Sequence, residues 1–224
     1  MALNIQSMFD RLMAAENLGG VKTTDALRRI ELLVDFSGDL GREDGNARAE
    51  RWCDELATRK LTAQQATILD YYRANVWGNR QKQKHSDAKA AWQWEQQELQ
   101  QQIFRLRSAA RHPGFEKLPR LRRCQILTNL GNQLNTLGRF VDAGPLWNRA
   151  LRNDQRFGMA LGNRGYGRIR YAKSLYDTGH RGVFLYFAHK DLSAALSPKA
   201  KFEGDGYPEA KTLFADLSVR LESC

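Results

Sequence analysis

Five polar residues are the strongest candidates for binding chemistry: Asn132, Asn163, Arg164, Tyr166 and Arg170. A side-chain amide offers two donors and an acceptor, which suits a peptide backbone or a carboxylate, and a guanidinium supplies the opposite charge. Asparagine forms helices poorly, at up to ~0.7 kcal/mol below alanine, so its use inside helical segments needs a reason. We therefore predict that these residues form one polar patch that binds a partner. Helix packing is the alternative explanation for the asparagines.

Histidine and cysteine give little sign of catalysis or metal binding. His180 and His189 have no Cys, Asp or Glu partner at the spacing of metal ligands. Cys53, Cys124 and Cys224 lie far apart and lack the surroundings of a nucleophile. We expect reduced thiols in a cytoplasmic protein that has no metal, no cofactor and no enzymatic activity.

Four glycines between residues 158 and 167 resemble a phosphate-binding loop only in composition. Gly158, Gly162, Gly165 and Gly167 lie within a helix-forming context and do not follow a strand. We expect them to permit close packing between helices.

The elements that must position the polar patch follow a pattern that is clearest from residue 127 to 154. The pattern alternates small and large residues in a fixed order: Leu127, Leu130, Gly131, Leu134, Gly138, Ala143, Trp147, Ala150 and Leu151. This order is typical of a tetratricopeptide repeat, a helix-turn-helix unit of roughly 34 residues. The small residues Gly131 and Ala143 are predicted to face each other where the two helices cross. An ordinary helical hairpin is the alternative.

The whole chain is predicted to be all-α: a tetratricopeptide-like helical-hairpin solenoid with N-terminal helices and a C-terminal capping helix. Residues 1–60 are expected to pack on an array formed by residues 61–224, as one continuous domain. The expected helices are 3–17, 24–38, 43–58, 62–77, 90–111, two within 121–154, 157–177, 182–196 and 208–221. Between them we expect a polar linker at 37–46, a loop or frayed end at 78–89, and a stop at Gly179.

Two residues depart from the repeat pattern. Gln155 stands where a proline usually closes the repeat, and Pro145 lies early in its second helix. Only the first turn of a helix tolerates proline without losing a hydrogen bond. We therefore expect that helix to begin late or irregularly.

Stacked repeats line a concave groove with one face of each first helix, and the polar candidates fall on or beside that face. The expected lining is Asn75, Gln125, Thr128, Asn132, Asn135, Gly162, Tyr166 and Arg170. Some tetratricopeptide proteins hold a peptide's C-terminal carboxylate with asparagines at the places of Asn132 and Asn163. The lysine of that clamp is replaced here by Thr128, so the clamp is incomplete.

The net charge of +10 is concentrated between residues 101 and 181. That segment has 16 basic and 4 acidic side chains, whereas residues 1–100 have 14 and 15 and residues 182–224 have 5 and 6. A solvated basic face, an acidic protein or peptide partner, and a nucleic acid each account for such an excess. No apolar run approaches the ~18 residues of a membrane helix, so we expect no membrane partner.

Three strings of the sequence resemble a family of prokaryotic proteins: AWQWEQQEL (91–99), RCQILTNLGNQLNTLGRFVDA (123–143) and FGMALGNRGYGRIRYAKSLYDTGHRGVFL (157–185). In that family a tetratricopeptide-like N-terminal region precedes a HEPN domain (higher eukaryotes and prokaryotes nucleotide-binding), which often cleaves RNA in toxin–antitoxin and anti-phage systems. The resemblance covers about residues 60–222. It implies the regulatory or sensing part of such a system, without the nuclease.

The usual HEPN signature, Arg-x4–6-His, occurs here as Arg80–His85, Arg107–His112 and Arg105–His112. Because arginine is frequent in this chain, about one match is expected by chance, and neither histidine lies on the paired helix face of a nuclease. We therefore expect a non-catalytic scaffold or adaptor that binds a protein or peptide. The alternative is an RNA-associated component that binds nucleic acid through residues 101–181.

Overall fold

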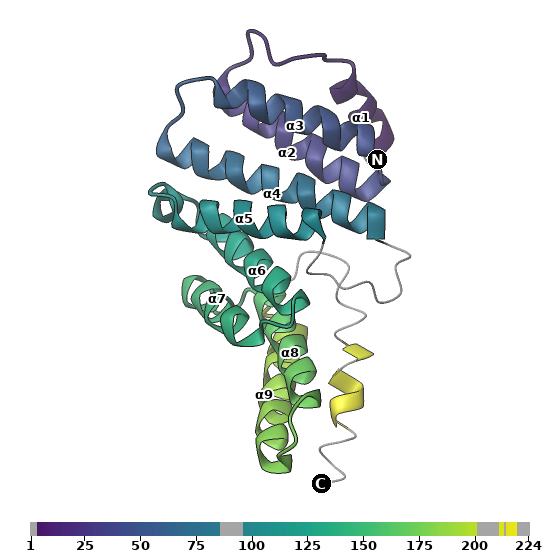
Figure 1. Ribbon diagram of the computed structural model, residues 1–224, viewed down its shortest axis with the longest axis vertical. Coiled ribbons are helices and arrows are strands. Elements are labelled where there is room, and N and C mark those ends of the chain that lie inside the picture. The colour runs from purple at the N-terminus through teal and green to yellow at the C-terminus, as the bar shows by residue number, and fades with distance from the viewer. Residues whose placement is uncertain (1–3, 86–95, 201–210, 213, 219–224) are drawn as a thin grey trace. The chain divides into compact units, whose positions relative to one another are not determined.

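Helix-forming residues dominate the sequence, and in the computed structural model they form nine α-helices, one short 3-10 helix and a short C-terminal helical segment within the part of the chain that the structure describes. The described residues are 4–85, 96–200, 211–212 and 214–218. Within each of the chain's two compact parts, consecutive helices pack against each other as antiparallel hairpin pairs (Figure 1). The chain divides into two compact units, residues 1–118 and 119–224, which we call unit 1 and unit 2.

Unit 1 is a stack of helices around an apolar core. Its helices are α1 (Ile5–Met13), α2 (Thr23–Leu40), α3 (Glu43–Ala57), α4 (Ala63–His85), α5 (Gln97–Arg111) and η2 (Phe115–Lys117). Helix α2 packs on α3, α3 on α4, and α4 on α5. Large side chains on these helices, including Phe9, Ile30, Trp52 and Leu99, are almost fully buried.

The polar segment 37–46, expected as a linker, belongs mostly to helices α2 and α3. Helix α2 continues to Leu40 and α3 begins at Glu43. Gly41 makes this short connection possible, because its φ of 64° is a left-handed conformation that glycine adopts at little cost. Its N–H donates to the carbonyl of Ser37 and closes the last turn of α2.

Of the two expectations for 78–89, a loop or a frayed helix end, the loop is wrong over the described part, because α4 continues as far as His85. Gly78 lies so close to the Gln102 side chain that a Cβ would overlap it, so this glycine allows α5 to pack against α4. Polar residues that follow bond to other helices: Asn79 Nδ2 donates to the Val34 carbonyl of α2 at 2.8 Å, and Arg80 Nε donates to Glu43 of α3 at 2.9 Å. Residues 90–95 of the expected next helix lie outside the described residues, and α5 begins at Gln97.

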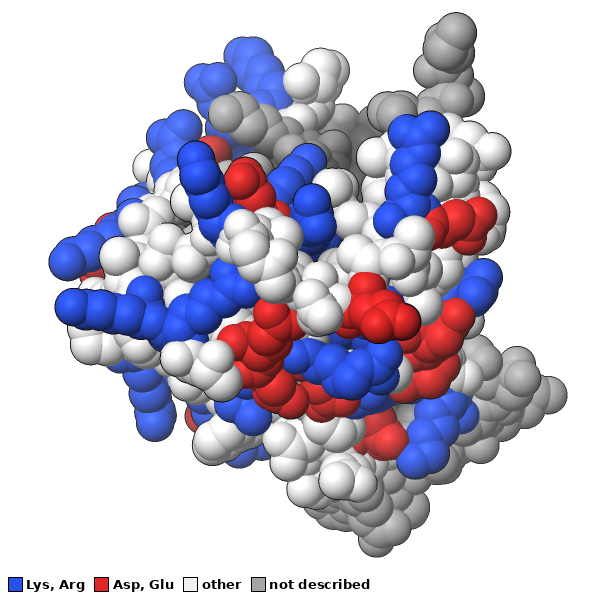
Figure 2. All heavy atoms as spheres, turned by 90° about the horizontal axis from the view of Figure 1, so that it is seen from above, with Lys and Arg blue, Asp and Glu red and all other residues white. Residues whose placement is uncertain are grey.

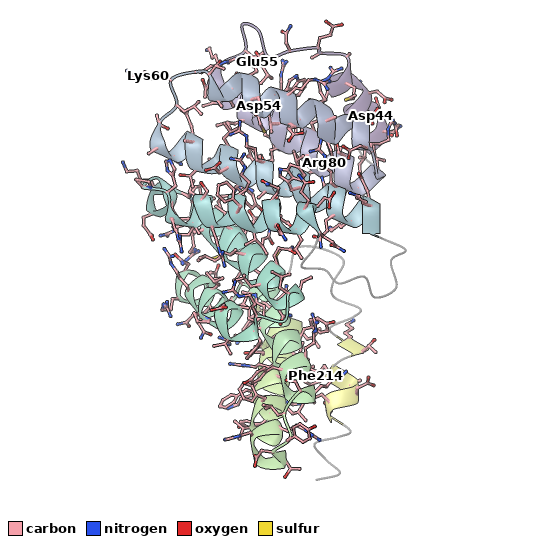
Figure 3. The ribbon with its side chains drawn as sticks, in the orientation of Figure 1. Asp44, Asp54, Glu55, Lys60, Arg80 and Phe214 are labelled. Atoms are coloured by element: carbon pink, nitrogen blue, oxygen red, sulfur yellow. The ribbon has the colours of Figure 1, made fainter. Side chains whose placement is uncertain are left out.

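Unit 2 consists of two helical hairpins and a short C-terminal helical segment. The helices are α6 (Arg120–Thr136), α7 (Phe140–Asn153), α8 (Gly158–Lys173) and α9 (Thr178–Leu196). Residues 211–212 and 214–218 are also helical, within the range expected for a last helix at 208–221. Leu217 packs with Ile169, Ala188 and Leu192 in one buried cluster, and Phe214 lies against it (Figure 3).

Two boundaries in unit 2 differ from the sequence prediction. Helix α7 begins at Phe140 and contains Pro145, so it does not begin late. Helix α8 ends at Lys173, and α9 begins at Thr178 with Gly179 in its first turn. Asp177 explains this start, because its side chain accepts from the His180 N–H at 2.6 Å and caps the helix.

The small residues of unit 2 lie at close approaches between helices, although one pairing differs from the prediction. A Cβ on Gly131 would lie 2.7 Å from Trp147 Nε1, so the nearest neighbour of Gly131 is the indole, one turn beyond Ala143. Ala143 itself is fully buried. In the second hairpin, a Cβ on Gly165 would lie 3.0 Å from Leu192 Cγ, so Gly165 packs on α9.

Candidate partner-binding site on helix α8

Two arginines of α8 share one buried carboxylate on α9. Arg164 forms a two-pronged salt bridge with Asp191, with Nε donating to Oδ2 at 2.8 Å and Nη2 to Oδ1 at 2.6 Å. Arg168 Nη1 donates to Oδ2 of the same aspartate at 2.5 Å. Asp191 is only 4% exposed, so the three groups form a compact ionic cluster between the two helices.

The cluster has one positive charge in excess, because two guanidiniums face a single carboxylate. Burial lowers the pKa of Arg168, Asp191 acts in the opposite direction, and the nearby charge of Arg164 adds to the lowering. Arg168 also donates to the Phe187 carbonyl at 3.1 Å and lies 5.4 Å from the centre of the Phe187 ring. An anionic group of a partner would be attracted to this excess.

Tyr166 and Arg170 of α8 form an exposed pair. Tyr166 is 37% exposed, and the Arg170 guanidinium carbon lies 6.0 Å from the centre of its ring. Arg170 Nη1 also approaches the Asn135 carbonyl in the last turn of α6 at 3.4 Å. The pair is therefore accessible and carries a cation held by a ring and a carbonyl group.

The two candidate asparagines make hydrogen bonds within unit 2, one between α6 and α7 and one within α8. Asn132 Oδ1 accepts from the indole N–H of buried Trp147 at 3.0 Å. Asn163 Nδ2 donates to the Met159 carbonyl of its own helix at 2.8 Å. Both remain half-buried, so each can still present part of its amide at the surface.

Two other residues expected to line the groove are buried. Thr128 is fully buried and Asn135 is 6% exposed, so neither presents a side chain to a partner. Both lie on α6, where the neighbouring positions Leu127 and Leu134 are also buried. The buried surface of α6 is therefore wider than the repeat pattern indicates.

Sequence reasoning missed Asp191 and Asn148, the partners of Arg164. Asn148 Oδ1 accepts from Arg164 Nη1 at 2.6 Å. Asp191 is the only acidic residue of α9, whose other positions are mostly apolar. A lone carboxylate on an apolar helix is a recognisable signal for a buried ion pair, because an unpaired buried charge is costly.

His112 and Arg105 of the Arg-x6-His match have partners on α4 and in the turn after α5. His112 Nδ1 lies 2.8 Å from Thr67 Oγ1 and accepts from the Gly114 N–H at 3.1 Å. Arg105 lies 3.6 Å from Asp70. The side chain of His85 lies outside the described residues. Among the residues with described positions, no three His, Cys, Asp or Glu side chains form a group that could hold a metal ion.

Several basic side chains of unit 1 have carboxylate partners at short range. Arg73 pairs with Asp54 at 2.6 Å, and Arg80 pairs with Glu43 at 2.9 Å and Glu50 at 2.8 Å. Burial lowers the pKa of Arg80, but its bonds to both glutamates outweigh burial and raise it. Figure 2 shows acidic and basic side chains interleaved over the middle of one face, and Figure 3 labels Asp54 and Arg80.

Comparison with known protein families, with curated proteins and with solved structures finds no match for this chain. None of the helices within the described ranges is long and apolar enough to cross a membrane.

Proposed function

We propose that this chain is a non-catalytic, tetratricopeptide-like adaptor whose unit 2 binds an acidic protein or peptide. The observation that carries the proposal is the surplus of cations on α8. Arg164 and Arg168 share one carboxylate, and Arg170 is held over exposed Tyr166 by ring and carbonyl contacts. A partner carboxylate could supply the missing negative charge there.

The distribution of charge between the units supports this assignment. Unit 2 has 17 basic and 9 acidic side chains, whereas unit 1 has 18 and 16. The excess of positive charge on unit 2 attracts acidic partners and speeds their association, whereas unit 1 has little excess charge. The half-buried amides of Asn132 and Asn163 add donors and acceptors for a peptide backbone.

The sequence resemblance extends the proposal to a setting. It places the adaptor in the regulatory or sensing part of a prokaryotic defence or toxin–antitoxin system, and this part rests on the three quoted strings alone. Loss of the gene in its own host should then alter survival under phage challenge.

Recovery of partners from native cell extract, with and without nuclease, tests the proposed function. The variant Tyr166→Ala/Arg170→Glu changes the exposed pair and leaves the buried ionic cluster intact. We expect a protein that survives nuclease treatment and is lost with this variant. Tyr176→Ala is the matched control, because Tyr176 is fully exposed elsewhere in the same unit. A protein retained equally by all three chains would contradict the proposed site.

Nucleic-acid binding by unit 2 is the second candidate function. The excess of basic residues between 101 and 181, most of which lie in unit 2, favours it, together with exposed aromatic rings at Tyr166 and Tyr176 that could stack on bases. In that case recovery depends on RNA, nuclease abolishes it, and the logarithm of affinity falls linearly with the logarithm of salt concentration.

A further inference from the structure

Helix α9 is apolar on both of its faces, but the described residues cover only one. Its inner face carries Ala188, Leu192 and Ala195, whose side chains are fully buried or nearly so. Its outer face carries Val183, Tyr186, Phe187 and Lys190, at the spacing of one helical stripe. An apolar stripe of a helix is normally packed against another element.

The outer stripe of α9 is exposed to an extent that is unusual for such large apolar side chains. Val183 is 51% exposed, Tyr186 48% and Phe187 45%. The two aromatic rings contact each other edge to face, with their centres 5.6 Å apart. Contiguous exposed apolar surface of this kind marks an interaction site.

Cations border both rings of the stripe. The Lys190 ammonium lies 5.0 Å from the centre of the Tyr186 ring, and Arg168 lies 5.4 Å from that of Phe187. Arg168 belongs to the ionic cluster that has one positive charge in excess, and Lys190 is itself exposed. The surface therefore combines an apolar centre with a positively charged border.

We propose that this stripe of α9 binds an acidic amphipathic helix of a partner protein. Apolar side chains of that helix pack on Val183, Tyr186 and Phe187, while its flanking carboxylates pair with Arg168 and Lys190. An apolar centre with charged flanks matches the way an amphipathic helix binds a groove or helix face through residues one turn apart. This inference rests on the proposed adaptor function and names the surface and the chemistry of the partner.

Charge and ring geometry favour this occupant over a second copy or a nucleic acid. Pairing α9 of two copies would bring together two units that each have a large positive excess, which repel each other. Base stacking on Tyr186 or Phe187 would compete with the cations that already lie over these rings. Carboxylates, in contrast, gain from the cations in their present positions.

The test uses the full chain and a labelled synthetic helical peptide. The peptide has leucines one turn apart on one face and glutamates on both flanks, and a scrambled peptide of the same composition serves as its control. Fluorescence anisotropy measures binding to the native chain, to Tyr186→Ala/Phe187→Ala, to Lys190→Glu and to the control Tyr176→Ala. Circular dichroism checks that each variant is folded.

We expect the native chain and Tyr176→Ala to prefer the amphipathic peptide to its scrambled form. The double alanine variant should bind it about tenfold more weakly or worse, the usual effect of removing central aromatic side chains. Lys190→Glu lies at an exposed position, so it keeps the test valid if the double variant does not fold, and it should also weaken binding.

Four results would overturn the inference. The first two are equal binding of the peptide by the native chain and its variants, and no preference of the native chain for the amphipathic peptide over the scrambled one. The third is that the same variants selectively lose binding of a single-stranded RNA probe. The fourth is that the same variants change the oligomeric state of the chain in sedimentation. If the α9 variants keep a protein partner that Tyr166→Ala/Arg170→Glu loses, the adaptor function stands and this surface is wrong. If extract yields no partner at all, the adaptor function itself fails.

Discussion

Gly131 and Gly144 should respond in opposite ways to the same change, because only one has a close neighbour. A Cβ on Gly131 would lie 2.7 Å from Nε1 and 2.9 Å from Cδ1 of the buried Trp147 indole. Gly131→Ala should therefore displace the ring and lower the free energy of unfolding by ~1–3 kcal/mol. Gly144 has no atom within 4 Å, so Gly144→Ala should raise it by up to ~1 kcal/mol through helix propensity.

Urea unfolding of the two alanine variants beside the native chain measures both effects. Equal stability changes in the two variants would show that the packing between α6 and α7 differs from this description.

Asn132 should prove necessary for stability as well as for any binding. Its Oδ1 is the acceptor for Trp147 Nε1, and Trp147 is fully buried. Asn132→Ala leaves that N–H without its acceptor, so we expect a loss of ~1–3 kcal/mol in the free energy of unfolding. Arg170→Ala should change it little, because Arg170 is exposed. A fluorescence melt that gives the two variants the same midpoint would contradict this assignment.

At the scale of single helices, Pro145 is the least favourable residue of α7. It is exposed and is the sixth residue of the helix, beyond the first turn in which proline is tolerated. Pro145→Ala should restore an N–H that donates to the Val141 carbonyl. Removing the proline also raises the entropy of the unfolded chain, which lowers the free energy of unfolding by a smaller amount. We expect the free energy of unfolding to rise by ~1–2 kcal/mol. A fall in the melting temperature would mean that α7 needs the proline to set its first turns.

The all-helical class and most helices of this chain could be predicted from the sequence. The apolar periodicity of a helix, and the places of small residues such as Gly131 and Gly165 along it, can be recognised from neighbouring positions in the sequence alone. Polar composition was misleading where polar residues bond to other helices. Residues 79–84 look like a loop in sequence but form the last turns of α4, since Asn79 and Arg80 have partners on α2 and α3.

The candidate site was less predictable for the same reason. Arg164 was recognised as a cation, but its buried partner Asp191 lies 27 positions away on another helix. Spacing within one helix carries no information about such a pairing. Only the isolation of Asp191 among the apolar residues of α9 hints at it.

At the scale of the whole molecule, each unit has its own buried thiol. Cys53 lies in unit 1 and Cys124 in unit 2, and both are free and fully buried. Burial raises the pKa of the Cys53 thiol to about 12 and that of Cys124 to about 11. Because the thiolate is the reactive form, neither should react with a thiol reagent at pH 8 while its unit is folded.

These raised pKa values also predict how stability depends on pH. The unfolded chain loses each thiol proton above a pKa of about 8.5, whereas the folded chain keeps it. The contribution of each buried thiol to the free energy of unfolding is therefore complete below that pH. It declines as the pH rises toward 11–12. By pH 10 the loss should be about 1–2 kcal/mol per thiol. In a Cys224→Ser background, Cys53→Ala and Cys124→Ala should each make the decline shallower in urea unfolding measured from pH 7 to 10.

Thiol labelling along the same urea series follows each unit separately. Simultaneous exposure of Cys53 and Cys124 means that the units unfold together, and separate exposure means that they do not. Rapid labelling of either thiol in the folded chain at pH 8 would contradict its burial.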